Sequence, residues 1–130
     1  MTDESTTVRR LMDLVRGFSE ERDWVQFHTP KDLGVALACE VGELLEHFRY
    51  RKDDEIRALL ADPTKKRQVA DEVADCLWLI LRIADVTAID LGAALAAKVE
   101  DAGRKYPVDQ SYGRADKYTA YLPRTDGESR

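Results

Sequence analysis

Apolar residues recur at steps of three and four along most of this chain, which is the period of α-helices with one buried face. The first stripe covers about Ser5 to Glu21 and consists of Val8, Leu11, Met12, Val15 and Phe18. Further stripes predict helices at about Leu33 to Tyr50, Lys65 to Val86 and Leu91 to Lys105. We find no convincing alternation of the kind that β-strands show. The pattern therefore predicts an all-α fold, a helical bundle of about four main helices.

Prolines and small polar residues mark the expected ends of these helices. Pro30 disfavours a helical backbone at Thr29, because its ring crowds the preceding residue. Asp32 is then the expected N-cap of the second helix. Asp90 is the expected N-cap of the fourth helix, and Pro107 terminates that helix.

The length of the chain fits one domain, because a second hydrophobic core would leave each half of the 130 residues too small. We expect residues 1–107 to form this domain, with a short helical turn within residues 51–63. Residues 108–130 are polar with scattered tyrosines, and we expect an extended polar C-terminal tail there, partly ordered at best.

Composition excludes several classes of protein. Hydrophobic residues make up 44% of the chain and charged residues 35%, which is typical of a folded, soluble protein. The longest uncharged apolar run, Cys76 to Leu81, is far shorter than the roughly 18 residues that span a membrane. Met1 to Thr7 is polar and acidic, so we expect no secretory signal and a cytoplasmic location. The net charge of −5 argues against broad binding to nucleic acid.

Two further features concern the helix interiors. Cys39 and Cys76 lie in apolar helical patterns without a C-x-x-C spacing, which favours structural thiols in a reducing compartment over a zinc site. From Cys76 to Leu81 the third helix is apolar nearly all round. A helix of this kind in so small a chain is buried on several sides, so we expect a homo-oligomer.

Carboxylates form two matching pairs on the predicted helices. Glu40 and Glu43 make an E-x-x-E pair, and Glu72 and Asp75 make an E-x-x-D pair. A three-residue step places both side chains of a pair on one helix face, where like charges repel. If the two helices are antiparallel, four oxygen ligands converge between them, which suits a hard divalent cation.

The composition of this acidic group favours magnesium, although the spacing alone leaves metal binding at even odds. The group has no cysteine at ligand spacing and no E-x-x-H pair, which argues against zinc and a ferritin-like di-iron site. His47 lies four residues after Glu43, so a mixed nitrogen and oxygen site is an alternative. The simplest alternative interpretation is a solvent-exposed acidic face, which is the usual role of a single E-x-x-E pair.

Three runs of this sequence resemble one known family. They are RDWVQFHTPKDLGVALACEVGELLEHFRY (Arg22 to Tyr50), DEVADCLWLILRIADVTAIDL (Asp71 to Leu91) and K-x-x-x-x-x-x-K-Y-P (Lys98 to Pro107). Together they resemble the MazG-like all-α nucleoside triphosphate pyrophosphatases, and within them the dCTP pyrophosphatase branch. The resemblance covers most of the chain between Val8 and Pro107.

The resemblance implies an enzyme that converts a nucleoside triphosphate and water to the monophosphate and diphosphate. Its substrate would be dCTP or a modified dCTP, its role house-cleaning of the nucleotide pool, and its assembly a dimer or tetramer. Mg²⁺ would be the cofactor, with Mn²⁺ as a substitute. The matching metal ligands are Glu40, Glu43, Glu72 and Asp75. Glu43, or else Glu40, would activate the attacking water.

The resemblance also implies a set of substrate-binding residues. Trp24 and His28 match positions beside the nucleobase, where an aromatic face can stack on a base. The positions matched to the phosphate-binding segment and its surroundings are Lys98, Arg104, Lys105 and Tyr106. Tyr50 stands where relatives commonly carry tryptophan, and Ala102 where they commonly carry asparagine, and both departures bear on the choice of base.

Plainer interpretations exist for several of these residues. Phe27 is expected to be a core anchor, and His28 is as well suited to a structural hydrogen bond as to substrate contact. Lys98 and Lys105 would also suit the C-terminal dipole of their helix. Cys76 and Trp78 are expected in the core or an interface.

The sequence is also compatible with two rival functions. A noncatalytic helical interaction module would use its acidic faces to bind a basic partner. A phosphatase would release orthophosphate in place of pyrophosphate. Magnesium-dependent pyrophosphate release separates the proposed enzyme from both.

Overall fold

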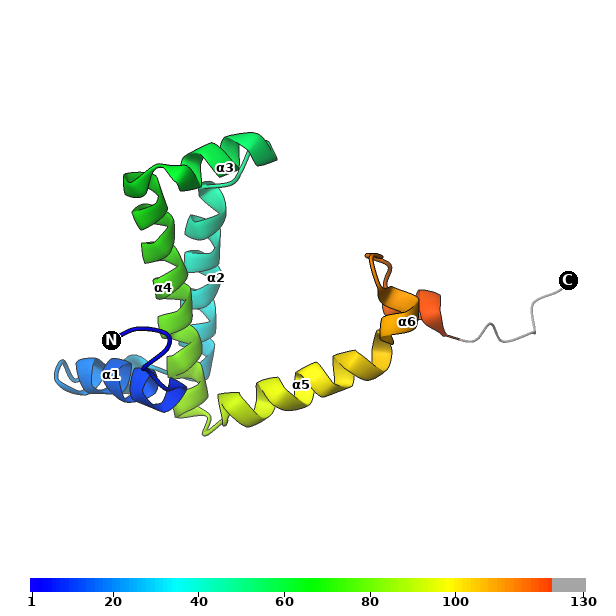
Figure 1. Cartoon of the computed structure of the whole chain (residues 1–130). Helices are drawn as coiled ribbons and strands as arrows, with labels where there is room; N and C mark the ends of the chain where they lie inside the picture. Colours follow the sequence, from blue (N-terminus) through cyan, green and yellow to red (C-terminus); the bar gives the residue numbers. More distant parts are fainter. Residues whose placement is uncertain (123–130) are drawn as a thin grey trace, which may run out of the picture. The chain divides into compact units, whose positions relative to one another are not determined.

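A computed structural model describes residues 1–122 of the chain, and these residues form helices and no strand (Figure 1). The described part of the chain consists of two compact units, which divide between Ile89 and Asp90 and which we describe separately. The first unit contains four α-helices and a 3-10 turn, namely α1 (Val8–Glu20), η1 (Val25–Phe27), α2 (Pro30–Glu46), α3 (Asp53–Ala61) and α4 (Pro63–Val86). The predicted all-α fold class is confirmed.

The first unit is built on the pair α2 and α4, which run side by side in opposite directions (Figure 1). The connection through α3 reverses the chain direction. The helix α1 packs against α4 near the C-terminal end of α4. The antiparallel arrangement on which the predicted convergence of carboxylates depended is therefore present.

The start of α2 differs from the prediction at one position. Thr29 is the N-cap, with Pro30 as the first helical residue, so the prediction of Asp32 as N-cap was wrong. The Thr29 hydroxyl accepts a hydrogen bond from the Asp32 backbone N–H at 3.1 Å and donates one to the Asp32 carboxylate at 2.7 Å. Proline favours the first helical position because its missing N–H would have no helical partner there. Asp90 caps α5 as predicted, accepting from Ala93 N–H at 2.9 Å.

The turns around α3 also differ from the prediction. The helix α2 ends at Glu46 rather than at Tyr50. Tyr50 itself adopts a positive φ of 62°, which is incompatible with a right-handed helix at that residue. The segment expected to hold only a helical turn forms α3, and α4 begins at Pro63 rather than at Lys65. Asp62 caps α4 through a 3.0 Å hydrogen bond from Lys65 N–H, which explains the earlier start.

The buried core of the first unit is small. It comprises the apolar residues Met12, Val15, Leu33, Val69, Cys76, Leu81 and Ala84. Phe27 is 63% exposed, so its expected role as a core anchor was wrong. Both cysteines are free, but Cys39 is exposed and Cys76 is buried, so only Cys76 fits the expectation of a structural thiol.

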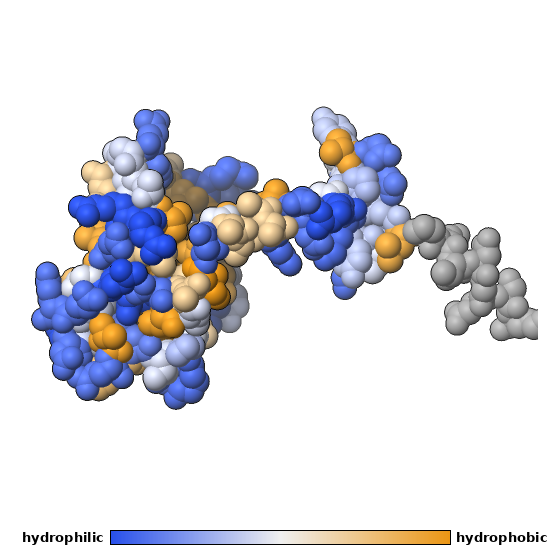
Figure 2. Space-filling model, turned by 90° about the horizontal axis from the view of Figure 1, so that it is seen from below, coloured by the Kyte–Doolittle hydropathy of each residue, from blue (hydrophilic) through white to orange (hydrophobic). Residues whose placement is uncertain are grey.

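Large apolar side chains remain exposed on both central helices. On α4, Val73, Leu77 and Ile80 recur at helical spacing and are all exposed, as are Val41 and Leu45 on α2. Figure 2 shows apolar residues reaching the molecular surface among hydrophilic ones. The apolar part of α4 is thus covered only in part by its own chain. Among the residues described, no helix combines the length and the apolar character needed to cross a bilayer.

The second unit contains α5 (Leu91–Lys105), α6 (Val108–Ser111) and η2 (Tyr118–Tyr121). Tyr106, at the C-cap of α5, contacts Tyr118 and Tyr121 edge to face, with ring centroids 6.3 Å and 6.0 Å apart. This part of the predicted tail therefore folds back through its tyrosines rather than being extended throughout. The end of the predicted tail, residues 123–130, lies outside the described residues.

Candidate active site

Three carboxylates from the two central helices meet in the first unit. Glu40 and Glu43 come from α2 and Glu72 from α4, and one carboxylate oxygen of each lies within 4.8 Å of the others. The E-x-x-E spacing places the first two on one face of α2, and the antiparallel packing of α4 brings the third alongside. Three oxygens at this separation, from two rigid helices, fit a hard divalent cation.

Asp75, the fourth predicted ligand, lies beside this group of three. It lines the same pocket as Glu40, and its charge acts on the Glu40 carboxyl. Burial is the main cause that raises the pKa of Glu40, and the charges of Glu43, Asp75 and Glu72 raise it further. The four acids therefore share one electrostatic environment, which a bound cation would neutralise.

A pocket of about 240 Å³ opens next to the carboxylates. Its lining residues are Phe18, Trp24, Ala36, Glu40, Asp75, Trp78 and Leu79. The wall is mostly apolar and aromatic, and two of the predicted metal ligands form its acidic side. A planar heterocycle in such a pocket would lie close to any ion held by the carboxylates.

The aromatic side of the pocket is organised around Phe18. Its ring contacts Trp78 edge to face with centroids 4.8 Å apart, and Trp24 in the same way at 5.8 Å. Trp24 was predicted at this site, whereas Trp78 was assigned to the core or an interface. A signal for Trp78 was available, because it follows Asp75 by three residues and so shares its helix face.

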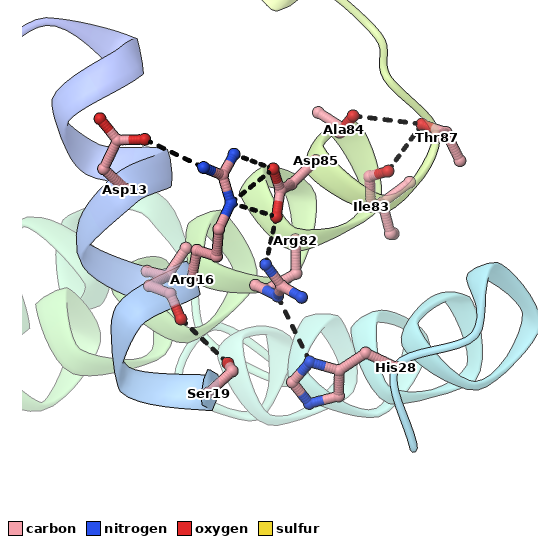
Figure 3. Close-up of polar contacts among 10 residues, drawn as sticks. Asp13, Arg16, Ser19, His28, Arg82, Ile83, Ala84, Asp85 and Thr87 are labelled. Carbon is pink, nitrogen blue, oxygen red and sulfur yellow. Dashed lines mark hydrogen bonds and ion pairs between the residues drawn. The ribbon is translucent and has the colours of Figure 1, made fainter. Parts of the chain in front are cut away.

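His28 is the C-cap residue of η1, and its ring lies against Arg82 near the C-terminal end of α4. Its ring Nδ1 accepts a hydrogen bond from Nε of Arg82 at 3.3 Å (Figure 3). Burial, and then the charge of Arg82, lower the pKa of His28. Among the residues described, His28 is not part of the pocket lining. Tyr50 is likewise outside this lining, and its side chain is 93% exposed in the turn after α2.

The predicted phosphate-binding residues belong to the second unit. Lys98, Arg104 and Lys105 lie on α5, and Tyr106 caps it. Arg104 pairs with Glu100 at 2.7 Å, and Lys105 pairs with Asp101 at 2.7 Å. The Lys105 ion pair lowers the pKa of the Asp101 carboxyl and raises that of Lys105. These pairs are exposed and weak, so a triphosphate could compete for the cations. Their role at the site stays a prediction.

Comparisons with known proteins agree with the fold. The family model described as MazG-like matches residues 35–120. The chain is 37% identical over 113 residues to dCTP pyrophosphatase 1 of Bos taurus, covering 87% of this chain and 67% of that protein. It is 34% identical over 113 residues to dCTP pyrophosphatase 1 of Homo sapiens, covering 87% of this chain and 66% of that protein.

A solved structure gives the same indication. The crystal structure of a pyrophosphatase from Archaeoglobus fulgidus is similar with a TM-score of 0.73 and 37% sequence identity. The match covers 82% of this chain and 98% of that one. The predicted family and the predicted class of enzyme, a pyrophosphatase, are confirmed by these relatives. With the helical fold, the convergent acids and these matches together, the chain belongs to the MazG-like family.

Proposed function

We propose that this protein hydrolyses nucleoside triphosphates between the α- and β-phosphates, releasing a nucleoside monophosphate and diphosphate, with dCTP or a modified dCTP as substrate. One observation carries the proposal, namely that Glu40 belongs both to the three converging carboxylates and to the lining of the aromatic pocket, which Asp75 also lines. The relatives named dCTP pyrophosphatase 1 support both the reaction and the base.

The proposed cofactor is Mg²⁺, with Mn²⁺ as a substitute. Glu40, Glu43 and Glu72 offer three oxygens within reach of one ion, and Asp75 completes the acidic side of the site. Oxygen-only ligands are those that Mg²⁺ prefers. When bound, the metal would neutralise charge on the phosphates and make a water molecule more acidic.

The chain's own residues would bind the base and orient the water. Trp24 is 46% exposed, so its ring can stack on a base that enters the pocket, and Trp78 would limit the depth of the pocket. Glu43 is the exposed member of the three converging acids, so a water molecule can reach its carboxylate. We therefore favour Glu43 as the group that orients and deprotonates the water, with Glu40 as the alternative.

The remaining predicted binding residues complete the proposal. Lys98, Arg104 and Lys105 of α5, with Tyr106, would hold the phosphates after exchanging their acidic partners for the substrate. Tyr50, exposed after α2, and His28 are assigned to the surroundings of the base. Ala102 offers no amide for a base edge, so discrimination among bases would rest on the shape of the pocket.

We place this activity in the cytoplasm as house-cleaning of the nucleotide pool, in a domain spanning residues 1–107. The free thiols of Cys39 and Cys76 suit a reducing compartment. The exposed apolar residues of α2 and α4 support a homo-oligomer, a dimer or a tetramer.

A nucleotide panel with and without Mg²⁺ tests the proposal. The intact protein should convert dCTP, or its 5-modified forms, to monophosphate and pyrophosphate only when the metal is present. Phosphorus NMR identifies the products, and orthophosphate without initial pyrophosphate would contradict the assigned bond. Glu43→Gln and Asp75→Asn should each lower kcat at least about a hundredfold while the protein stays folded.

Glu46→Gln provides the matched control for these variants. Glu46 follows Glu43 by three residues on α2, but its carboxylate pairs with Arg49 at 3.1 Å and is not one of the three converging acids. This variant should retain activity. A folded wild-type protein with no nucleotide hydrolysis in Mg²⁺ or Mn²⁺ would instead favour the noncatalytic interaction module.

A further inference from the structure

A charged side chain is buried in the first unit away from the converging acids. Arg82 on α4 is only 1% exposed, and its guanidinium lies between two partners (Figure 3). Nη1 donates to the carboxylate of Asp85, one turn further along α4. Nε donates to Nδ1 of His28 at 3.3 Å. Asp85 is held in turn by Arg16 of α1, whose Nε lies 3.0 Å from both carboxylate oxygens.

A buried arginine is costly unless its donors are paired. Asp85 shares its single negative charge between Arg16 and Arg82, and the guanidinium of Arg82 also reaches across to His28, which is 54 residues away in sequence. The hydrogen bond to His28 therefore pairs a further donor of the buried guanidinium, and it also joins His28 to α4.

The contact determines the chemical state of the histidine. Arginine is always protonated and can only donate, so His28 Nδ1 must accept and carries no proton. The ring is then neutral with its proton on Nε2. The charged groups near the Nδ1 side of the His28 ring are Arg82 and Asp85 of α4 and Arg16 of α1. Burial, and then the charge of Arg82, lower the pKa of His28.

The histidine is also the end of the segment that carries Trp24. Residues Trp24 to His28 are attached to α1 at one end, where Trp24 N–H donates to the carbonyl of buried Ser19 at 2.9 Å. Phe27 and His28 N–H groups close the turn within the segment. Within residues 1–122, the hydrogen bond from Arg82 to His28 is the only one that joins a side chain of this segment to a helix.

Trp24 itself has few restraints. Its ring is nearly half exposed, and its aromatic contact is an edge-to-face one with Phe18. The pocket that it lines is also lined by Trp78, Leu79 and Asp75 of α4. Arg82 follows Leu79 by three residues on the same helix, so the attachment point of the segment and the part of the pocket lining that α4 supplies belong to one rigid element.

We propose that Arg82 is a positioning residue, which holds neutral His28 and thereby fixes the Trp24–His28 segment on α4 with Trp24 at the pocket wall. Protonation of His28 would convert Nδ1 from acceptor to donor and release the segment. The proposal predicts a pocket that loosens in acid. Its activity readout rests on the proposed function, whereas its spectroscopic readouts do not.

The first test uses the nucleotide-free protein. Nitrogen NMR of the histidine rings should show His28 with an unprotonated Nδ1 and a protonated Nε2 at neutral pH. In Arg82→Met the His28 signals should change to a mixture of tautomers, while those of His47, the other histidine, stay unchanged. A protonated Nδ1 in the wild-type protein would overturn the proposal.

The second test follows Trp24 directly. In a Trp78→Phe background Trp24 is the sole tryptophan, so fluorescence quenching by acrylamide reports its exposure. Arg82→Met should increase the quenching constant about twofold, and acidification should do the same when Arg82 is intact. Arg16→Gln is the matched control, because Arg16 contacts Asp85 but not His28. Equal quenching in the Arg82 and Arg16 variants would overturn the proposal.

The third test measures hydrolysis of dCTP. Arg82→Met should raise KM about tenfold with kcat changed less than about threefold, since the residue acts on base placement and not on the reacting atoms. A fall in kcat at constant KM would contradict the positioning role. If Arg82→Met does not fold, His28→Ala and His28→Gln replace it in the quenching test. Glutamine can accept from Arg82, so it should restore the low quenching that alanine loses, and failure to do so would count against the proposal.

Discussion

At the scale of single residues, ion pairs stabilise a charge that is buried in this protein. Asp85 is the acceptor for two arginines, Arg16 and Arg82, and its side chain is only 12% exposed. The hydrogen bond and charge of Arg16, with a smaller effect of Arg82, hold the pKa of Asp85 below its ordinary value of 3.8. The pair joins α1 to α4, so these side chains position one helix on another.

Replacing this carboxylate should destabilise the protein strongly. Asp85→Asn leaves Arg82 buried without its counter-charge, and we expect the free energy of unfolding to fall by about 3–5 kcal/mol in urea titrations. Because the folded pKa is depressed, the stabilisation is complete above pH 3.8 and is lost as the pH falls below it. The gap between wild type and variant should therefore narrow in acid. Asp13→Asn is the control, because Asp13 is exposed and its ion pair with Arg16 is long, at 3.4 Å. An equal loss of unfolding free energy in this variant would refute the argument.

At the scale of elements, α2 and α4 combine stable packing with an unfavourable cluster of charge. The two helices bring Glu40, Glu43 and Glu72 together, although each carboxylate raises the free energy of its neighbours. Natural proteins commonly accept such a local loss of stability where a binding site requires it. A divalent cation would remove the repulsion.

The charge repulsion among these acids predicts that Glu40→Gln changes the stability of the protein in opposite directions without and with metal. Glu40→Gln should raise the stability of the metal-free protein by roughly 1 kcal/mol, because it removes one charge from the group. The pKa of Glu40 is raised, so the repulsion that this variant relieves is present at neutral pH and vanishes as the pH falls below the folded pKa. Thermal melts in Mg²⁺ should show stabilisation of the wild type but little of Glu40→Gln. Glu46→Gln should respond to Mg²⁺ like the wild type; a metal-independent Tm in all three proteins would exclude the site.

At the scale of the whole molecule, the small core leaves apolar surface that its own chain does not cover. Val73, Leu77 and Ile80 form a stripe along α4, and Val41 and Leu45 lie exposed on α2. Contiguous apolar surface on a small protein usually marks an interface. The predicted oligomer would cover it with a second copy of the chain.

A charge placed in the stripe on α4 should therefore dissociate the assembly. We expect the wild type to be a dimer or tetramer in light scattering coupled to size exclusion, and Ile80→Lys to shift it toward the monomer, because a buried ammonium group opposes association. Gln68→Lys adds the same charge at an exposed polar position of the same helix and should leave the mass unchanged. A monomeric wild type at micromolar concentration would contradict the prediction.

Local sequence pattern was sufficient for several features of this protein. Helical periodicity located the main helices, Asp90 was recognisable as a cap, and the three-residue spacing placed Glu40 and Glu43 on one face. These features depend on residues within one or two turns of each other, where the geometry of a helix is constant. The motifs in Arg22 to Tyr50 and Asp71 to Leu91 also identified the family.

Contacts between distant segments were decided only by the tertiary structure. The packing of α4 against α2 determines that Glu72 joins the group of three while Asp75 lines the pocket. The packing of α1 against α4 brings Phe18 to Trp78. The hydrogen bond between Arg82 and His28 joins residues 54 positions apart, which no local period can indicate. Side-chain packing sets the register between helices, and packing depends on every residue at the contact rather than on the spacing within either helix.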